Sequence, residues 1–227
     1  MAMQLLIANK NYSSWSMRPW VLMRELGLPF EELNLRFDFG EHSTFRDTVA
    51  RHSPAGRVPV LLDDGFAVWD TLAITEYLHE RAPQAGVWPQ ATRERARARS
   101  LVCEMHSGFP ALRNHFPMNI EAALPEIGAR VLAEQAGVRA DLARIEAMWC
   151  EALAVSGGPM LFGAFSAADA FYAPVCMRMR SYALPLSAAA RSYVERVAAL
   201  ASVQRWIADA LAEHDFVVED EPYRTSR

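Results

Sequence analysis

The sequence contains little cysteine. Cys103, Cys150 and Cys176 are the three cysteines in 227 residues, they lie far apart, and none belongs to a C-x-x-C pair. This spacing argues against zinc and dithiol motifs, which need paired cysteines, and indicates no disulfide framework. Because free cysteines usually pack as small apolar side chains, we expect all three to be buried.

Long apolar runs and an excess of positive charge are also missing. No uncharged apolar stretch reaches the ~18 residues of a membrane-spanning helix, and the first residues, MAMQLLIANKN, lack the pattern of a secretory signal. The formal net charge of -4 gives no general attraction to nucleic acid or to an anionic membrane. We therefore expect a cytoplasmic protein that binds neither nucleic acid nor membranes.

No metal-binding pattern accompanies the six histidines, which show no H-E-x-x-H spacing, so we expect no metal. The chain does have 52% hydrophobic and 22% charged residues, which is the composition of a globular protein with a sizeable core. Its length fits one large or two small domains.

The N-terminal region mixes strand and helix signals. Residues 5–8, LLIA, form a short apolar run that predicts a buried strand. A helix is predicted next, with Ser16 as its N-cap, Pro19 in its first turn and Gly27 at its end.

Alternating apolar residues at 32–37 predict a second strand, and residues 57–69 predict a hairpin with an Asp-Gly turn. A helix is predicted over 70–82, whereas 40–55 is predicted to be irregular. This order gives a small sheet with both parallel and antiparallel pairs.

Strand signals end after residue 82. We predict an α/β domain at 1–82, a linker at 83–92, an all-α helical domain at 93–215 and a tail without regular structure at 216–227. Helical periods in the second domain cover 93–115, 126–154, 166–182, 187–199 and 202–214.

The stretch NKNYSSWSMRPW places Ser13, Ser14 and Ser16 at the start of the first helix. Free amide groups and the helix dipole favour an anion there, and a serine hydroxyl adds a hydrogen bond. A charge-assisted hydrogen bond of ~1.5–3 kcal/mol is enough to ionise a thiol of pKa about 8.5 at neutral pH. The alternative is that all three serines only cap or turn the chain.

Two further stretches have the character of a binding site. In SPAGRVPVL, Pro59 begins an edge strand or makes a turn, and the backbone of Val58 beside it is free to pair with a peptide. In WDTLAI, Asp70 and Thr71 stand at a helix start, where they suit the amine and the carboxylate of an amino acid head group. Simple strand initiation and helix capping are the alternatives.

Together these stretches resemble the N-terminal domain of cytosolic glutathione transferases. YSSWSMRPW resembles the family's serine motif and is closest to the zeta-class pattern S-S-C-S-x-R, with Trp15 in place of the cysteine. GRVPVL resembles the family's V-P segment, whose proline is cis, and DTLAITEYL resembles its E-S-x-A-I-x-x-Y-L segment. LFGAFSAADAFYAPV resembles the family's capping box, in which Ser166 and Asp169 have a structural role.

The resemblance implies the glutathione transferase fold, a thioredoxin-like α/β N-terminal domain followed by an all-α C-terminal domain. It also implies that Ser14, or Ser13 in the zeta-class alignment, binds and ionises the glutathione thiol. The other implied glutathione contacts are Arg57, Val58, Pro59, Asp70 and Thr71, and the implied substrate contacts are Trp15, His106 and Arg113.

The function implied is that of a serine-type glutathione S-transferase, a homodimeric detoxification enzyme that uses glutathione against a small hydrophobic electrophile. Two alternatives stay open. One is a glutathione-dependent isomerase or disulfide reductase, and the other is a non-catalytic transferase-like module that binds a ligand or a protein.

Overall fold

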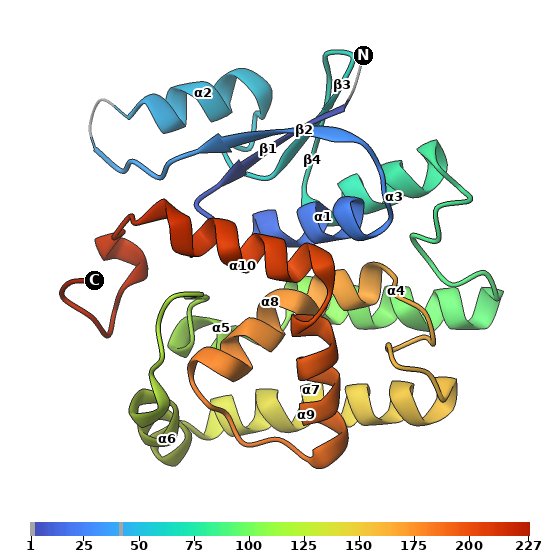
Figure 1. Cartoon of the computed structure of the whole chain (residues 1–227), viewed down its shortest axis with the longest axis vertical. Helices are drawn as coiled ribbons and strands as arrows, with labels where there is room; N and C mark the ends of the chain where they lie inside the picture. Colours follow the sequence, from blue (N-terminus) through green and yellow to red (C-terminus); the bar gives the residue numbers. More distant parts are fainter. Residues whose placement is uncertain (1–2, 41–42) are drawn as a thin grey trace.

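The computed structural model describes residues 3–40 and 43–227 (Figure 1). Its N-terminal part holds a four-stranded sheet built from β1 (Met3–Ala8), β2 (Phe30–Leu35), β3 (Val60–Asp63) and β4 (Phe66–Trp69). The strand order is β2-β1-β3-β4, with β1 and β2 parallel and the other two pairs antiparallel. The predicted mixed sheet and the hairpin are therefore confirmed.

The side chains on the two faces of β1 pack into two different hydrophobic clusters. Leu5 and Ile7 face the main hydrophobic cluster, whereas Leu6 and Ala8 join a smaller cluster with Phe45 and other residues on the opposite face. This alternation follows from the twofold period of a strand. In Figure 1, α1 (Ser14–Glu25) and α3 (Thr71–Arg81) lie below the sheet, and α2 (Thr44–His52) lies above it.

Helix α1 begins earlier than predicted. Ser13 is its N-cap residue, whereas Ser16 is buried inside the helix and accepts a hydrogen bond from the Ala8 amide at 3.2 Å. The prediction of Ser16 as the cap is therefore wrong, and Pro19 lies in the second turn rather than the first. The earlier start places Ser14 as the first residue of the helix.

Helix α2 was not predicted. The sequence analysis described 40–55 as irregular, but residues 44–52 are helical and the Ser43 hydroxyl accepts from the Arg46 amide at the helix start. Residues 41 and 42 of that segment lie outside the described residues. The prediction failed because Phe45 and Val49 are the only buried apolar positions on this helix, which makes its periodicity short.

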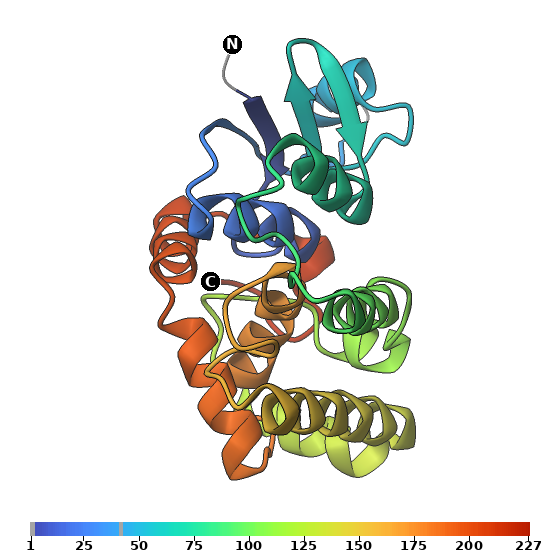
Figure 2. The same ribbon diagram turned by 90° about the vertical axis from the view of Figure 1, so that its right-hand side faces the viewer.

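The helical half occupies the space below the sheet (Figures 1 and 2). All five predicted helical segments are present, and two of them are divided. Their bounds are α4 (Thr92–Ser107), α5 (Pro110–His115), α6 (Pro125–Glu134), α7 (Ala136–Ser156), α8 (Ala167–Ser181), α9 (Ala188–Ala198) and α10 (Ala201–Glu213).

The break between α4 and α5 has a steric cause. A Cβ atom on Gly108 would lie 2.5 Å from the Glu104 carbonyl oxygen, and Phe109 adopts a left-handed conformation with φ 58°. Pro110 then begins α5, where its missing amide hydrogen removes no helical bond. Helix α5 then packs on α7, and its Arg113 contacts the ring of Trp15 on α1.

One hydrophobic cluster joins the two halves. It includes Trp20 of α1 and Trp206 of α10, whose rings meet edge-on at 5.3 Å. Val87 and Trp88, in the segment predicted as a linker, are buried in the same cluster, and the Val87 carbonyl accepts from the Ala167 amide. This segment is therefore a packed part of the fold.

The chain end is also ordered against the rest of the molecule. A short 3-10 helix spans Val218–Asp220, and Glu221 is buried with its carboxylate accepting from the Tyr12 hydroxyl at 2.7 Å and the Asn119 amide at 2.8 Å. The prediction of a tail without regular structure is wrong at these residues. Long-range side-chain contacts, rather than local periodicity, order this segment.

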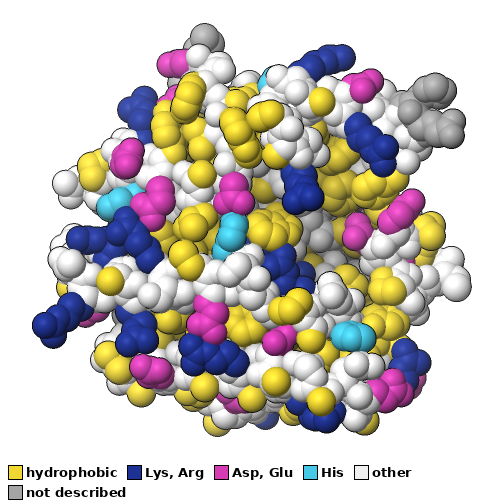
Figure 3. Space-filling model, turned by 180° about the vertical axis from the view of Figure 1, so that it is seen from behind, with side chains coloured by type: hydrophobic (Ala, Val, Ile, Leu, Met, Phe, Trp, Pro, Cys, Tyr) yellow, Lys and Arg dark blue, Asp and Glu magenta, His cyan; other side chains and the backbone are white. Residues whose placement is uncertain are grey.

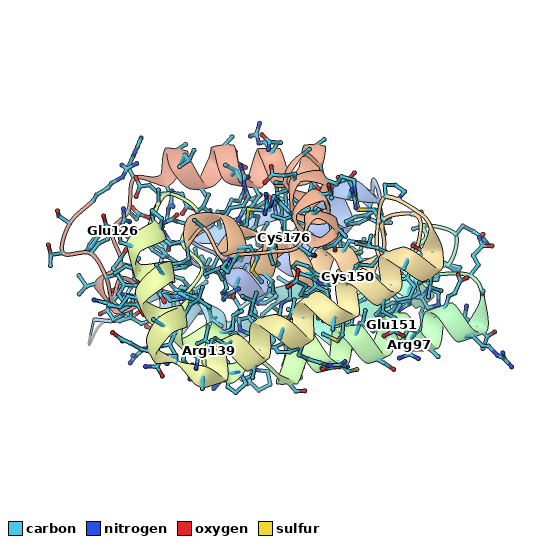
Figure 4. The ribbon with its side chains drawn as sticks, turned by 90° about the horizontal axis from the view of Figure 1, so that it is seen from below. Arg97, Glu126, Arg139, Cys150, Glu151 and Cys176 are labelled. Carbon is cyan, nitrogen blue, oxygen red and sulfur yellow. The ribbon has the colours of Figure 1, made fainter. Side chains whose placement is uncertain are left out.

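The three thiols differ in exposure. Cys176 is buried, Cys150 is half-buried and Cys103 is exposed, so the expectation of three buried cysteines is wrong for Cys103. Figure 4 shows Cys176 in the interior between helices and Cys150 on α7. Burial raises the pKa of Cys176, which keeps this thiol protonated.

Candidate active site

A cavity of about 670 Å³ lies between the two halves of the chain. Its walls include Ser14, Val58 and Asp70 from the N-terminal half, and Arg113 and Arg178 from the helical half. Figure 3 shows a hollow on this face of the molecule, between the upper and lower layers, with hydrophobic and Lys or Arg side chains around it. Except for His106, all residues predicted to form the site line this cavity.

The two serines of the first loop differ in what their hydroxyl groups do. Ser13 makes no side-chain cap bond and donates to the Ser16 hydroxyl oxygen at 2.7 Å. Ser14 lines the cavity, is 8% exposed, and its hydroxyl has no hydrogen-bond partner among the described residues. The Ser14 hydroxyl is therefore free to donate to a ligand at the start of α1.

Tyr12 also lines the cavity, but its hydroxyl is engaged. It donates to Glu221 at 2.7 Å, and burial followed by this carboxylate raises the pKa of Tyr12 to about 12. A phenol in this state stays protonated at neutral pH, with its proton directed at the carboxylate. It is therefore poorly placed to stabilise a thiolate.

The Val58–Pro59 peptide bond is cis, as the resemblance implied. Pro59 precedes β3, which pairs with β1 on one side and β4 on the other, so the idea that it begins an edge strand is wrong. Val58 nevertheless lies beyond the last paired residue, Val60, and lines the cavity together with the exposed Arg57. Its backbone groups are thus positioned to meet an extended ligand.

Asp70 and Thr71 meet His106 at the start of α3. Asp70 caps the helix by accepting from the Leu72 amide at 2.8 Å, and its other carboxylate oxygen lies 3.3 Å from His106 Nε2. The Thr71 hydroxyl is 3.5 Å from His106 Nδ1. Burial lowers the pKa of His106, and although Asp70 raises that pKa, Arg18 and Arg113 lower it further, so the ring is neutral at pH 7.

His106 does not line the cavity itself. Its ring stands edge-on to the indole of Trp15 at 5.1 Å, behind the cavity wall. Trp15 also contacts two cations, because the Arg18 and Arg113 guanidinium carbons lie 4.0 Å and 4.8 Å from its ring centre. Trp15, His106 and Arg113, which the resemblance implied as substrate contacts, thus form a contiguous group.

The sequence analysis missed Arg178 and Asp220 as cavity residues. Arg178 is 4% exposed, and its Nε donates to the Phe116 carbonyl at 2.7 Å. Asp220 comes from the ordered chain end, where burial and the neighbouring carboxylates raise its pKa to about 6. No local motif signals either residue, since the tertiary fold alone brings them to the cavity.

Within residues 3–40 and 43–227, no group of three His, Cys, Asp or Glu side chains is arranged to hold a metal ion. None of the helices there is long and apolar enough to cross a membrane.

The overall architecture has close counterparts among solved structures. A glutathione transferase homologue from Burkholderia, solved with bound glutathione, matches with a TM-score of 0.68 and 24% identity, over 94% of this chain and 100% of that one. The chain has the glutathione transferase fold. Residues 12–81 match the family model described as "Glutathione S-transferase, N-terminal domain".

Curated relatives match shorter stretches of the chain than the solved structures do. Dichloromethane dehalogenase from Methylorubrum extorquens is 40% identical over 77 residues, or 33% of this chain and 26% of the relative. Maleylacetoacetate isomerase from Dictyostelium discoideum is 29% identical over 101 residues, or 44% of this chain and 45% of the relative. The chain thus spans about a quarter to under a half of the length of these relatives.

Proposed function

We propose that the chain is a serine-type glutathione S-transferase, in which Ser14 and the first-turn amides of α1 hold the glutathione sulfur as a thiolate. The observation that carries the proposal is the free Ser14 hydroxyl at the start of α1, in the same cavity as Val58, Asp70 and Thr71. These residues suit the cysteinyl backbone and the γ-glutamyl head group of the tripeptide. Glutathione bound in a neighbour of the same fold supports this choice of ligand.

The energetics are sufficient for ionisation. A thiol of pKa about 8.5 needs a reduction of ~1.5–2 units, or roughly 2–3 kcal/mol, to be mostly ionised at pH 7. One charge-assisted hydrogen bond contributes about 1.5–3 kcal/mol, and the helix dipole adds ~0.3–1 kcal/mol. The thiolate then attacks an electrophilic carbon, forming a C–S bond while the leaving group departs with its electron pair.

Replacing the two serines separately tests the assignment. Ser14→Ala should lower kcat/KM for conjugation of a chlorodinitrobenzene at pH 7 by about 10- to 100-fold, since it removes the donor to the thiolate. Ser13→Ala is the matched control and should change kcat/KM by less than about threefold, because its hydroxyl donates to Ser16 instead. A larger loss with Ser13→Ala, or no loss with either variant, would contradict the role of Ser14.

The isomerase alternative has one observation in its favour, the match to a maleylacetoacetate isomerase over 101 residues. An isomerase would use the same glutathione thiolate as a transferase but would release glutathione unchanged at the end of the reaction. Analysis of the products distinguishes the two reactions, because a transferase accumulates a stable conjugate and an isomerase or disulfide reductase does not. A non-catalytic module would leave the thiol pKa of bound glutathione near its free value.

We also propose that the protein is a cytoplasmic homodimer that works in detoxification of small electrophiles with an apolar body. The edge strand β4 presents Phe66, which is 62% exposed, and in a dimer the partner would cover this ring. Light scattering after gel filtration should give twice the mass of one chain. A mass of one chain at micromolar concentration would contradict this proposal.

A further inference from the structure

Two guanidinium groups, those of Arg113 and Arg178, line the cavity, and a third, that of Arg18, lies against the ring of the cavity residue Trp15. Arg18 is 1% exposed, Arg178 is 4% exposed and Arg113 is half-buried, and in the part of the chain that the structure describes none of them forms an ion pair. Burial lowers the pKa of each group, and repulsion from neighbouring arginines adds to this for Arg18 and Arg178, whereas the Asp70 carboxylate raises the pKa of Arg18 alone. Buried positive charge of this kind is costly unless an anion compensates for it.

Arg113 and Arg178 both line the cavity and keep donors available to it. Arg113 uses one terminal nitrogen on the His106 carbonyl at 3.2 Å, and no described residue accepts from its other nitrogens. Arg178 uses Nε on the Phe116 carbonyl and one terminal nitrogen on the Pro174 carbonyl at 3.3 Å. No described residue accepts from its second terminal nitrogen, which leaves that donor to a ligand.

The nearest acidic residues do not neutralise this pair. Asp220 lines the same cavity, yet its pKa is raised to about 6 by burial, Glu219 and Glu221, whereas an arginine partner would lower it. Asp70 caps α3 and faces His106. The positive charge on α5 and α8 is therefore not balanced by the protein.

We infer that Arg113 and Arg178 form an anion subsite for the second substrate, so that the electrophile carries a carboxylate on its apolar body. The inference rests on the proposed function and narrows its substrate class. The expected glutathione contacts, Val58, Asp70 and Thr71, come from the N-terminal half, while this subsite comes from the helical half. A guanidinium pair suits a carboxylate because its planar fork matches two oxygens.

Trp15 lies where it can orient an electrophile relative to the anion subsite. Its indole stacks on the guanidinium of Arg18 at 4.0 Å and contacts that of Arg113 at 4.8 Å, and it lines the cavity next to Ser14. An aromatic electrophile that packs on Trp15 would thus place its carboxylate toward Arg113 and its reacting carbon toward the thiolate at Ser14. The thiolate displaces a halide, which leaves with its electron pair, and the thiol proton has already passed to solvent.

A matched pair of electrophiles tests the subsite. A chlorodinitrobenzoate and its methyl ester differ only in the charge of one group, and the catalysed rates are corrected for the uncatalysed reaction. We expect the wild-type protein to have a kcat/KM at least about tenfold higher for the acid than for the ester. Equal values, or a preference for the ester, would overturn the inference.

Variants assign the preference to the arginines. Arg113→Gln should lower kcat/KM for the acid by about 10- to 100-fold, while changing that for the ester, and the KM for glutathione, by less than about threefold. Arg178→Lys, which keeps the charge but loses the fork, should reduce the preference for the acid about three- to tenfold. Arg180→Gln is the matched control on α8, since Arg180 does not line the cavity and its side chain is 44% exposed, and it should leave the preference unchanged.

Binding without catalysis separates this inference from the proposed function. Calorimetry with a dinitrobenzoate and with the corresponding benzamide, neither of which has a leaving group, measures the subsite in the absence of glutathione. We expect the acid to bind at least about tenfold more tightly, and Arg113→Gln to remove the difference. If the acid and the amide bind equally to the wild type, the subsite is refuted, whatever the outcome of the conjugation assays. If the binding preference holds but no conjugate forms, the proposed transferase reaction fails and the anion subsite stands.

Discussion

Tyr12 and Ser14 lie two residues apart at the entrance to α1, and their hydroxyl groups are in opposite states. The Tyr12 hydroxyl donates to the buried carboxylate of Glu221 at 2.7 Å, whereas the Ser14 hydroxyl has no partner among the described residues. Only the second is available to a ligand without breaking a buried hydrogen bond. The local sequence does not show this difference, because Glu221 is 209 positions further along the chain.

Tyr12→Phe should therefore affect stability more than thiol activation. The variant leaves Glu221 with one donor fewer and should lower the free energy of unfolding by about 1–3 kcal/mol in urea titrations. Conjugation at pH 7 should stay within about threefold of the wild type. Tyr223→Phe is the matched control, since its hydroxyl donates to the backbone carbonyl of His115 at 2.8 Å. Loss of thiol activation in Tyr12→Phe, comparable with that in Ser14→Ala, would contradict the division of roles.

Helix α8 carries Arg178 into the cavity and depends on its N-terminal cap. Ser166 Oγ accepts from the Ala168 amide at 3.3 Å, and the Asp169 carboxylate accepts from the Ser166 amide at 2.9 Å, which confirms the predicted capping box. Asp169 also accepts from the Leu161 amide and the Tyr193 hydroxyl. The sequence predicted the box, but not the two bonds that join it to a loop and to α9.

The buried carboxyl group of Asp169 predicts that the stability of the protein depends on pH. Burial raises the pKa of Asp169 to about 6, although its hydrogen bonds lower it, so the folded state holds this proton more tightly than the unfolded chain does. Its stabilising contribution is fully present below about pH 4 and is lost as the pH rises through 6, a change of roughly 2–3 kcal/mol. Comparing urea unfolding of wild type and Asp169→Asn isolates this group from other carboxylates.

We expect the stability of the wild type relative to Asp169→Asn to fall by about that amount between pH 4 and pH 7. A difference between the two proteins that stays constant over this range would show that Asp169 titrates alike in the folded and unfolded states.

The elements with a clear local sequence signal were predictable, whereas those without one were not. Strand β1, the hairpin and α8 follow from apolar runs, an Asp-Gly turn and a capping box, all of which are local. Helix α2 has a single turn of apolar spacing, and the divided α4 and α5 depend on a close approach of Gly108 to the Glu104 carbonyl. Such features depend on three-dimensional contacts and therefore cannot be predicted from local sequence patterns.

At the scale of the whole molecule, the loop before α1 and the C-terminal segment meet at the cleft. The loop before α1 is held by side chains from α10 and the C-terminal segment, including Glu213, which accepts from the Lys10 amide at 2.8 Å, and Glu221. The same segment places Asp220 in the cavity. The cavity residues Ser14, Val58 and Asp70 could be predicted because each sits in a local motif. Arg178 and Asp220 could not, because only the assembled fold brings them to the cavity.

The account as a whole depends on the ionisation state of sulfur at the start of α1. Titrating the ultraviolet thiolate absorbance of glutathione bound to wild type and to Ser14→Ala measures it directly. We expect the bound thiol pKa to lie about 1.5–2 units below the free value in the wild type, and Ser14→Ala to return it by at least about one unit. A thiol that remains protonated at pH 7 on the wild-type protein, or one whose pKa is the same in both proteins, would contradict the assignment.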